Sequence, residues 1–204
     1  MVSFARKPKR EVAMGKIIVE MTMSLDGYTA GLHVNKQNPM GVGGERLHHW
    51  IIGSKNGIDA GVIAEGRKNM GAVILGKTMF DVGLQFWEDT PYPVPSFVLT
   101  HESRVDQQMK SAAFTFIDDG IESALQKAKD IAGGKNIHII GGANVVQQFI
   151  KARRFDELHL HIVHILLGEG DRLFDNINNE QVELDCAEII PSTGVTHYKF
   201  HVRK

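Results

Sequence analysis

The amino-acid sequence predicts one α/β domain in which helices pack on a single mixed β-sheet. The front of the chain alternates short β-rich runs with helical patterns, as βα units do. The back instead carries consecutive β-like runs with little helix between them, which is typical of an antiparallel meander. With 204 residues, of which 43% are apolar and 23% charged, the chain is long enough to bury one sizeable core.

The first predicted strands and helices are separated by glycine-containing turns. Lys16–Met23 is expected to form a strand buried on at least one face, and Ser24–Gly27 the turn that ends it. Tyr28–Gly44 is a long glycine- and asparagine-containing loop, and loops of this length more often cover a functional site than merely connect elements. The next expected elements are helices at Glu45–Ile52 and Ile58–Met70, with Val62, Ile63 and Met70 facing inward, and strands at Ala72–Leu75, Ser96–Thr100 and Phe114–Ile117.

The clearest helical pattern is Gly120–Ala132. Asp118 or Asp119 is expected to cap its N-terminus, and Gly133-Gly134 to end it. The apolar positions recur at helical spacing and predict one face packed on the sheet. That face consists of Ile121, Ala124, Leu125, Ala128 and Ile131.

Asn136–Phe149 combines a strand, a glycine pair and a helix within 14 residues. The run Ile137–Ile140 predicts a buried strand, and Gly141-Gly142 follows it directly before a helical pattern. Such a turn presents bare backbone N–H groups that a phosphate can approach closely, because glycine has no Cβ atom. The alternative is a tight connecting turn that binds nothing, and the full dinucleotide fingerprint of three glycines is absent.

The last part of the chain predicts an antiparallel meander. Its β-like runs are Leu158–Val163, Ile165–Leu167 with Leu173-Phe174, Val182–Ile190 and Thr196–Val202. Cys186 lies in an alternating apolar run, so it is interpreted as a small core residue. As the only cysteine it excludes an internal disulfide and fits a reducing compartment, the cytoplasm.

Charge and hydropathy exclude several classes of partner. The net charge of −1 creates no global field toward nucleic acid or an acidic membrane, and no apolar run is long enough to span a bilayer. Residues 1–15 form a basic tail of net charge +3 that is expected to be disordered, with residues 16–204 forming the single domain. The tail lacks the apolar core of a secretory signal, and Met14 is a candidate natural start.

Three predicted strands end in residues suited to phosphate. Gly76-Lys77-Thr78 follows one strand, Thr100-His101 the next, and Gly141-Gly142 the central one. Ligands of open α/β sheets bind at the carboxyl ends of strands, where a cation, a hydroxyl group and free backbone amides would hold an anion. The alternative for Gly76-Lys77-Thr78 is a helix start with an exposed lysine.

Four segments resemble dihydrofolate-reductase-like proteins in sequence and order: Met21–Gly31, Ala72–Phe80, Ile139–Val146 and Glu157–Phe174. The similarity, spanning Lys16 to Val202, is greatest to the reductase domain of the riboflavin-biosynthesis deaminase–reductase and its small stand-alone relatives. It implies a mixed, mainly parallel sheet flanked by helices, with antiparallel strands at the C-terminal end.

The resemblance also implies a cofactor, NADPH, and the residues that would hold it. Lys77 stands where many relatives carry arginine, so bidentate phosphate binding would be lost. His164 stands where relatives often have proline. The implied cofactor residues are Gly76, Lys77 and Thr78 at one phosphate, Thr100 and His101 at the adenosine phosphate, and Gly141, Gly142, Ala143, Asn144 and Val145 at the pyrophosphate.

A reductase of this kind transfers hydride to an electron-poor carbon and must also supply one proton. The resemblance places Ser24 and Asp26 near the nicotinamide and substrate, and Asp26 is the first candidate for the proton donor. Asp59 is a further candidate that would contact substrate, and Trp50 could form an apolar wall for a flat heterocycle. The alternatives are an Asx-turn role for Asp26 and ordinary core packing for Trp50.

Histidines recur in the C-terminal strands. His159 and His161 share one face of a strand at a spacing that suits a metal, and His197 and His201 lie on another strand. A third convergent ligand is missing, so the sequence favours a polar sheet face that could pack at a subunit interface, and no metal is expected.

The sequence therefore predicts an NADPH-dependent oxidoreductase that acts on a small pterin-, pyrimidine- or flavin-like heterocycle. The similarity to 5-amino-6-(5-phosphoribosylamino)uracil reductases and dihydrofolate reductases implies this activity and a homodimer. The alternatives are a non-catalytic nucleotide-binding relative of the same fold and a histidine-based metalloenzyme.

Overall fold

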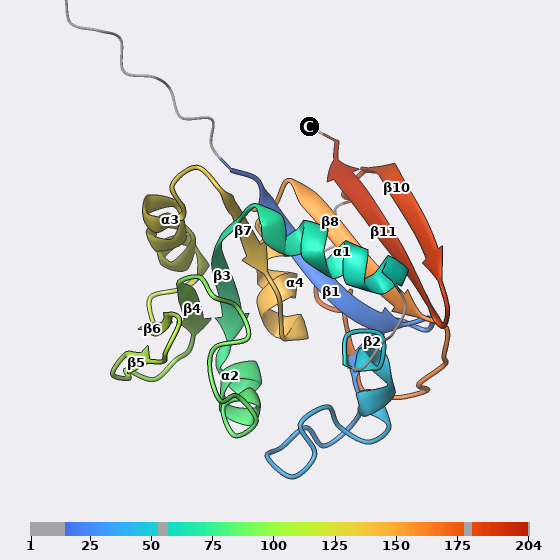
Figure 1. Ribbon diagram of the computed structural model, residues 1–204, viewed down its shortest axis with the longest axis horizontal. Coiled ribbons are helices and arrows are strands. Elements are labelled where there is room, and N and C mark those ends of the chain that lie inside the picture. Colours follow the sequence, from blue (N-terminus) through green and yellow to red (C-terminus); the bar gives the residue numbers. More distant parts are fainter. Residues whose placement is uncertain (1–14, 53–56, 178–180, 204) are drawn as a thin grey trace, which may run out of the picture.

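The computed structural model describes residues 15–52, 57–177 and 181–203. One large sheet runs through the molecule, with helices on both of its faces (Figure 1). The strands are β1 (Ile17–Ser24), β2 (Tyr28–Ala30), β3 (Met70–Gly76), β4 (Ser96–Leu99), β5 (Gln107–Gln108), β6 (Ala113–Ile117), β7 (Asn136–Ile139), β8 (Glu157–Val163), β9 (Asp171–Arg172), β10 (Leu184–Ser192) and β11 (Val195–Val202). The helices are the 3₁₀ helix η1 (Gly44–His48), α1 (Gly57–Lys68), α2 (Lys77–Gly83), α3 (Ile121–Ala132) and α4 (Ala143–Lys151).

The sheet has nine strands in the order β10-β11-β8-β1-β7-β3-β4-β6-β5. β8, β1, β7, β3, β4 and β6 run parallel to their neighbours within this series, whereas β11 and β10 add to β8 as antiparallel strands. A short β5 closes the other edge in antiparallel pairing with β6. The predicted mixed, mainly parallel sheet with antiparallel C-terminal strands is therefore confirmed.

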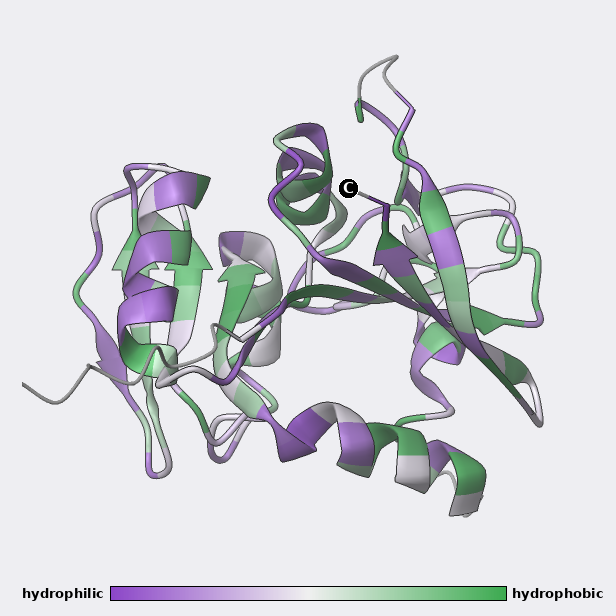
Figure 2. Ribbon diagram, turned by 90° about the horizontal axis from the view of Figure 1, so that it is seen from above, coloured by the Kyte–Doolittle hydropathy of each residue, from purple (hydrophilic) through white to green (hydrophobic). Residues whose placement is uncertain are grey.

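The two faces of the sheet differ in character around β1. One face of β1 carries Val19, Met21 and Met23, which belong to the main apolar core together with residues of α3 and α4. The opposite face carries Glu20 and Thr22, and α1 crosses over it (Figure 1). Figure 2 shows α1 on the opposite side of the sheet from α4. Among the described residues of α1, only Asp59 is fully buried, so this helix covers the sheet with little apolar packing.

Several local predictions need correction. α3 has no side-chain cap, because Gly120 occupies the N-cap position in place of Asp118 or Asp119. Ile131 is 54% exposed, because the buried stripe of α3 continues from Ala128 to Ala132 and leaves Ile131 beside it. Cys186 is exposed, because β10 is the edge strand and lacks a covering layer. Met70 belongs to β3, and Ile165–Leu167 forms no strand.

Most other predicted elements are confirmed within a few residues. Gly133 ends α3 in the left-handed conformation, with φ of 61°. The expected helix at Glu45–Ile52 is the shorter η1. No helix in the described ranges is long and apolar enough to cross a membrane. The predicted basic tail up to Met14 lies outside the described residues.

Candidate functional site

A cleft of about 1350 Å³ opens where β3, β4 and β7 end. These strands are neighbours in the sheet, so the loops that follow them meet at one edge. The Gly76 amide donates a hydrogen bond to the Gly141 carbonyl over 2.7 Å. The two glycine-containing loops predicted as phosphate sites are therefore directly joined.

All ten cofactor residues expected from the resemblance line this one cleft. They come from three separate connections, after β3, after β4 and between β7 and α4. The residues are Gly76, Lys77, Thr78, Thr100, His101, Gly141, Gly142, Ala143, Asn144 and Val145.

The glycine turn before α4 leaves space beside its backbone. Gly141 has φ of 120°, a conformation that favours glycine, and its peptide bond to Gly142 is cis. A Cβ atom added at Gly142 would meet no heavy atom within 4 Å. Gly142 provides no side-chain cap to α4, so the first turn of this helix presents backbone amides without a capping side chain. This open, amide-lined turn fits the diphosphate of a dinucleotide.

Lys77 takes part in a local ion-pair network. Its ammonium lies 3.0 Å from Asp81 Oδ2 and 3.7 Å from Glu102 Oε1, and Arg104 Nη1 lies 2.7 Å from Asp81 Oδ1. Burial raises the pKa of Asp81, but the hydrogen bonds from Arg104 and Lys77 outweigh it and hold that pKa below its usual range. Lys77 remains one-third exposed, so an anion in the cleft can compete for it.

Asp26 and Ser24 occupy a different position. Ser24 Oγ donates to Asp26 Oδ1 over 2.5 Å, and the amides of Leu167 and Gly168 donate to the Asp26 carboxylate over 3.0 and 2.8 Å. These bonds, that from Ser24 above all, lower the pKa of Asp26 from 3.8 to about 2. Neither Ser24 nor Asp26 is among the described residues that line the cleft. Asp26 therefore ties the turn after β1 to the loop after β8, a contact of longer range than the Asx turn considered from the sequence.

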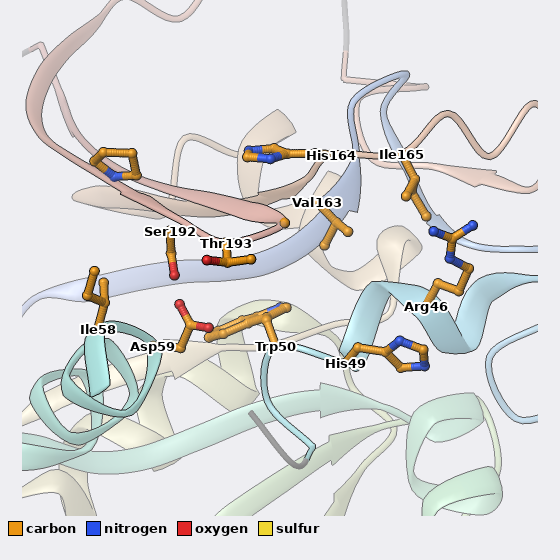
Figure 3. Close-up of a pocket in the computed structure, with 12 residues that line it drawn as sticks. Arg46, His49, Trp50, Ile58, Asp59, Val163, His164, Ile165, Ser192 and Thr193 are labelled. Carbon is orange, nitrogen blue, oxygen red and sulfur yellow. The ribbon is translucent and has the colours of Figure 1, made fainter. Parts of the chain in front are cut away.

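Trp50 lies between the cleft and a second cavity of about 840 Å³, and lines both. Asp59 lines the second cavity and is 1% exposed. Figure 3 shows the Asp59 carboxylate directed toward Ser192 and Thr193 at the β10–β11 turn, with Trp50 beside it. Trp50 and Asp59 therefore lie together at the second cavity, and of the two only Trp50 also lines the cleft.

Sequence reasoning expected a polar sheet face at the histidines of β8 and β11 but missed that Glu20 and Thr22 of β1 join it beneath Trp50. The β-ladder places Thr22, His161 and His197 side by side on β1, β8 and β11. Glu20, two residues before Thr22 and therefore on the same face, reaches His138 Nδ1 at 2.7 Å. Glu20 and His161 both line the cleft. The sequence signal for this extension of the face was Glu20, a carboxylate among the apolar residues of β1.

The histidines of this face are buried in contacts with carboxylates and with each other. His159 Nε2 lies 2.9 Å from Glu157 Oε2, and His161 Nδ1 lies 2.8 Å from His197 Nδ1. Within the described ranges, no group of three or more metal-ligating side chains has an arrangement that could hold a metal ion.

Comparison with known proteins assigns the fold to a family. The model of the RibD C-terminal domain matches residues 15–198. The chain belongs to the RibD C-terminal domain family. Two Bacillus subtilis (strain 168) proteins, both uncharacterized, are similar in sequence. YyaP is 26% identical over 196 residues, covering 91% of this chain and 94% of YyaP. YwjB is 36% identical over 66 residues, covering 32% of this chain and 37% of YwjB.

Two solved structures share the fold. A putative riboflavin biosynthesis protein from Shewanella sp. PV-4 superposes with a TM-score of 0.71 at 24% identity, covering 93% of this chain and 99% of that one. Dihydrofolate reductase from Enterococcus faecalis, complexed with NADP(H), gives a TM-score of 0.62 at 17% identity, covering 94% of this chain and 99% of that one. The expected dihydrofolate-reductase-like fold and its riboflavin-biosynthesis relatives are thereby confirmed.

Proposed function

We propose that this protein is an NADPH-dependent reductase that transfers hydride to a small pterin-, pyrimidine- or flavin-like heterocycle. The family assignment and the reductase-like fold support the reaction class. The Enterococcus faecalis reductase of the same fold was solved with NADP(H), which supports the cofactor.

The observation that carries the proposal is the junction of the two phosphate loops. Gly76 N donates to Gly141 O over 2.7 Å, so the Lys77 ammonium and the amides of the Gly141–Gly142 turn border the same space. A cation and an amide-lined turn at one site suit a diphosphate, since both supply donors to anionic oxygens. Thr100 and His101 extend the same cleft toward the adenosine side.

The substrate would occupy the other end of the cleft. Trp50 offers an aromatic face, and Glu20 and Thr22 add polar groups that can orient a heterocycle with ring nitrogens. When bound, the dinucleotide supplies the hydride, and this chain's residues position the ring and handle the proton. In this proposal, the role of Asp26 is to stabilise the turn after β1.

A cytoplasmic homodimer completes the proposal. The exposed Cys186 fits a reducing compartment. The edge strand β10 carries Ile189, which is 55% exposed, and an open edge of this kind can pair with a second copy.

The proposal is tested by titrating NADPH into purified protein and following tryptophan fluorescence or heat of binding. Lys77→Met should weaken NADPH binding about tenfold, because one hydrogen-bonded charge on phosphate is lost. Lys151→Met is the matched control, since Lys151 is exposed in the last turn of α4 and is not among the described residues that line the cleft. Equal affinities of both variants would contradict the assigned phosphate site.

Turnover is then measured as substrate-dependent loss of nicotinamide absorbance across pterins, pyrimidines and flavins. NADPH oxidation with one class supports the reductase. Binding without oxidation of NADPH by any of them would favour the non-catalytic nucleotide-binding alternative.

A further inference from the structure

Four titratable side chains form a row beneath Trp50 that joins the cleft to the second cavity. His161 Nε2 lies 3.4 Å from Glu20 Oε1, and His161 Nδ1 lies 2.8 Å from His197 Nδ1. His197 Nε2 in turn lies 3.1 Å from Asp59 Oδ1. Glu20 lines the cleft and Asp59 lines the second cavity, so the row connects two spaces that Trp50 separates.

The row is short of one proton in its ordinary ionisation state. Each of its three contacts joins two atoms that both accept hydrogen bonds unless one carries a proton. Two neutral imidazoles supply two protons, and two ionised carboxylates supply none. A third proton is needed whichever tautomers the histidines adopt. Without it, one of the three contacts would place two buried acceptor atoms against each other with no hydrogen between them.

The extra proton belongs on the row itself. His138 Nδ1 contacts Glu20 Oε2 at 2.7 Å, and one proton of a neutral imidazole fills that contact. His138 Nε2 is buried without a hydrogen-bond partner, so a second proton on His138 would be unsatisfied and would leave the row still short.

Within the row, the extra proton lies on the pair of imidazoles. Burial raises the pKa of Glu20, but hydrogen bonds and charge from His138 and His161 outweigh it and hold that pKa well below its usual range. Burial lowers the pKa of His197, although Asp59 opposes this effect. The indole of Trp50 lies 4.4 Å from the His161 ring, centroid to centroid, and can stabilise an imidazolium by cation–π interaction.

Other charged groups face this row from neighbouring elements. His159 on β8 carries a lowered pKa because it is buried, with Glu20 and Glu157 acting in the opposite direction. Tyr92, in the loop before β4, has a raised pKa through burial and the Glu20 charge, so it stays neutral. Arg67 of α1 also lines the cleft, and its charge lowers the pKa of Tyr92.

We propose that Asp59, His197, His161 and Glu20 form a proton relay that carries the reaction's proton from the second cavity to the substrate in the cleft. This inference rests on the proposed reductase function. It assigns a source to the proton that the substrate needs in addition to the hydride. Asp59, His197 and His161 are positioning residues in it, and Glu20 is the group that reaches the substrate.

The transfer balances as follows. The Glu20 carboxylate takes the Nε2 proton of His161 and gives it to the substrate nitrogen as hydride adds to the adjacent C=N carbon, so that the Nε2–H bond breaks as the N–H bond of the product forms. The proton between the two Nδ1 atoms stays on His161 and the Nε2 proton stays on His197, so both imidazoles are left neutral. After the two imidazoles change to the tautomers with protons on His161 Nε2 and His197 Nδ1, water in the second cavity returns one proton through Asp59 to His197 Nε2.

The stored proton is tested in the ligand-free protein by nitrogen-detected or long-range proton–nitrogen NMR of the imidazole rings. His161→Gln and His197→Gln assign the signals. The spectra should show three ring protons shared by His161 and His197, so that one of the two rings is an imidazolium in the resting protein. Asp59→Asn and Glu20→Gln should each reduce the imidazolium signal, since each removes a charge from the row. A neutral His161 and His197 throughout would overturn the relay, as would an imidazolium signal that neither variant changes.

The kinetic arm compares His197→Gln with His201→Gln, an exposed histidine on the same strand. Glutamine preserves a polar side chain at position 197 but cannot pass a proton. His197→Gln should lower kcat about 10- to 100-fold and raise the solvent isotope effect, with the NADPH dissociation constant unchanged. The His201→Gln control should match the wild type. An unchanged kcat in His197→Gln would overturn the relay, even with the imidazolium present. Absence of turnover in the wild type would instead count against the reductase function. The NMR result would then decide only whether the row holds the extra proton.

Discussion

Replacing Gly76 by alanine should force apart the two loops that border the phosphate site. The backbone at Gly76 has φ of −91°, which alanine adopts without strain. The new Cβ atom would nevertheless lie 3.0 Å from Val145 Cγ2 and 3.5 Å from the Gly142 amide nitrogen. Carbon atoms pack best at roughly 3.5–4.0 Å, so Val145 or the turn must move by about 0.5 Å or more.

The contact distance sets the size of the effect. Overpacking of a buried site typically costs about 1–3 kcal/mol, and about 1.5 kcal/mol would lower Tm by roughly 3–6 °C in a domain of this length. Val145 is 6% exposed, and Val145→Ala alone should cost roughly 1.5–2.5 kcal/mol through lost burial and a cavity. In the double variant the methyl group of the alanine at position 76 occupies that cavity. The loss of unfolding free energy should therefore be about 1 kcal/mol smaller than the sum of the losses in the two single variants.

The double-mutant cycle is measured by denaturant unfolding of the wild type, both single variants and the double variant. Gly76→Ala should also weaken NADPH binding, and Val145→Ala in the same chain should restore part of it. Strictly additive free energies of unfolding would refute the reasoning, because they would mean that positions 76 and 145 are not in contact.

Three further predictions concern two residues outside the cleft. Asp26→Asn should leave kcat/KM within about twofold, since Asp26 binds the turn and not the substrate, whereas a loss of tenfold or more would restore it as the proton donor. The pKa of Asp26 is lowered in the folded state, so its ionised form stabilises the fold above pH 3.8, and this contribution is lost as the pH falls toward 2. Asp26→Asn should therefore flatten the acid limb of a stability–pH curve, and an unchanged limb would contradict the assigned hydrogen bonds. Cys186→Ser should change Tm by no more than about 2 °C because the thiol is exposed, and a larger loss would indicate a buried site.

Most of the sheet could be predicted because its strands carry their own signal. Ala72–Leu75 and Ile137–Ile140 are short β-rich apolar runs bounded by turn residues, and both are central strands in the structure. The error at Cys186 has a physical origin, since alternation along β10 resembles that of a half-buried strand but no layer covers this edge.

The loops at the proposed phosphate end of the cleft could be predicted from the sequence, whereas the link between Glu20 and the histidines beneath α1 could not. Gly76 ends the buried strand β3 and Gly141 comes shortly after the buried strand β7, so a local pattern marks the place where the two loops meet. The contact between Glu20 and His161 joins residues 141 positions apart. Only the register of β1 against β8 brings them to one face, and the histidines on β8 had suggested a polar surface or a metal site.

The most direct test is a crystal structure of the protein grown with NADPH. The diphosphate oxygens should lie within hydrogen-bonding distance of the backbone amides at Gly142 and Ala143, with the Lys77 ammonium beside them. The nicotinamide ring should point toward Trp50 and Glu20. Density for the dinucleotide outside this cleft, or a diphosphate remote from both loops in a crystal that contains bound NADPH, would contradict the account.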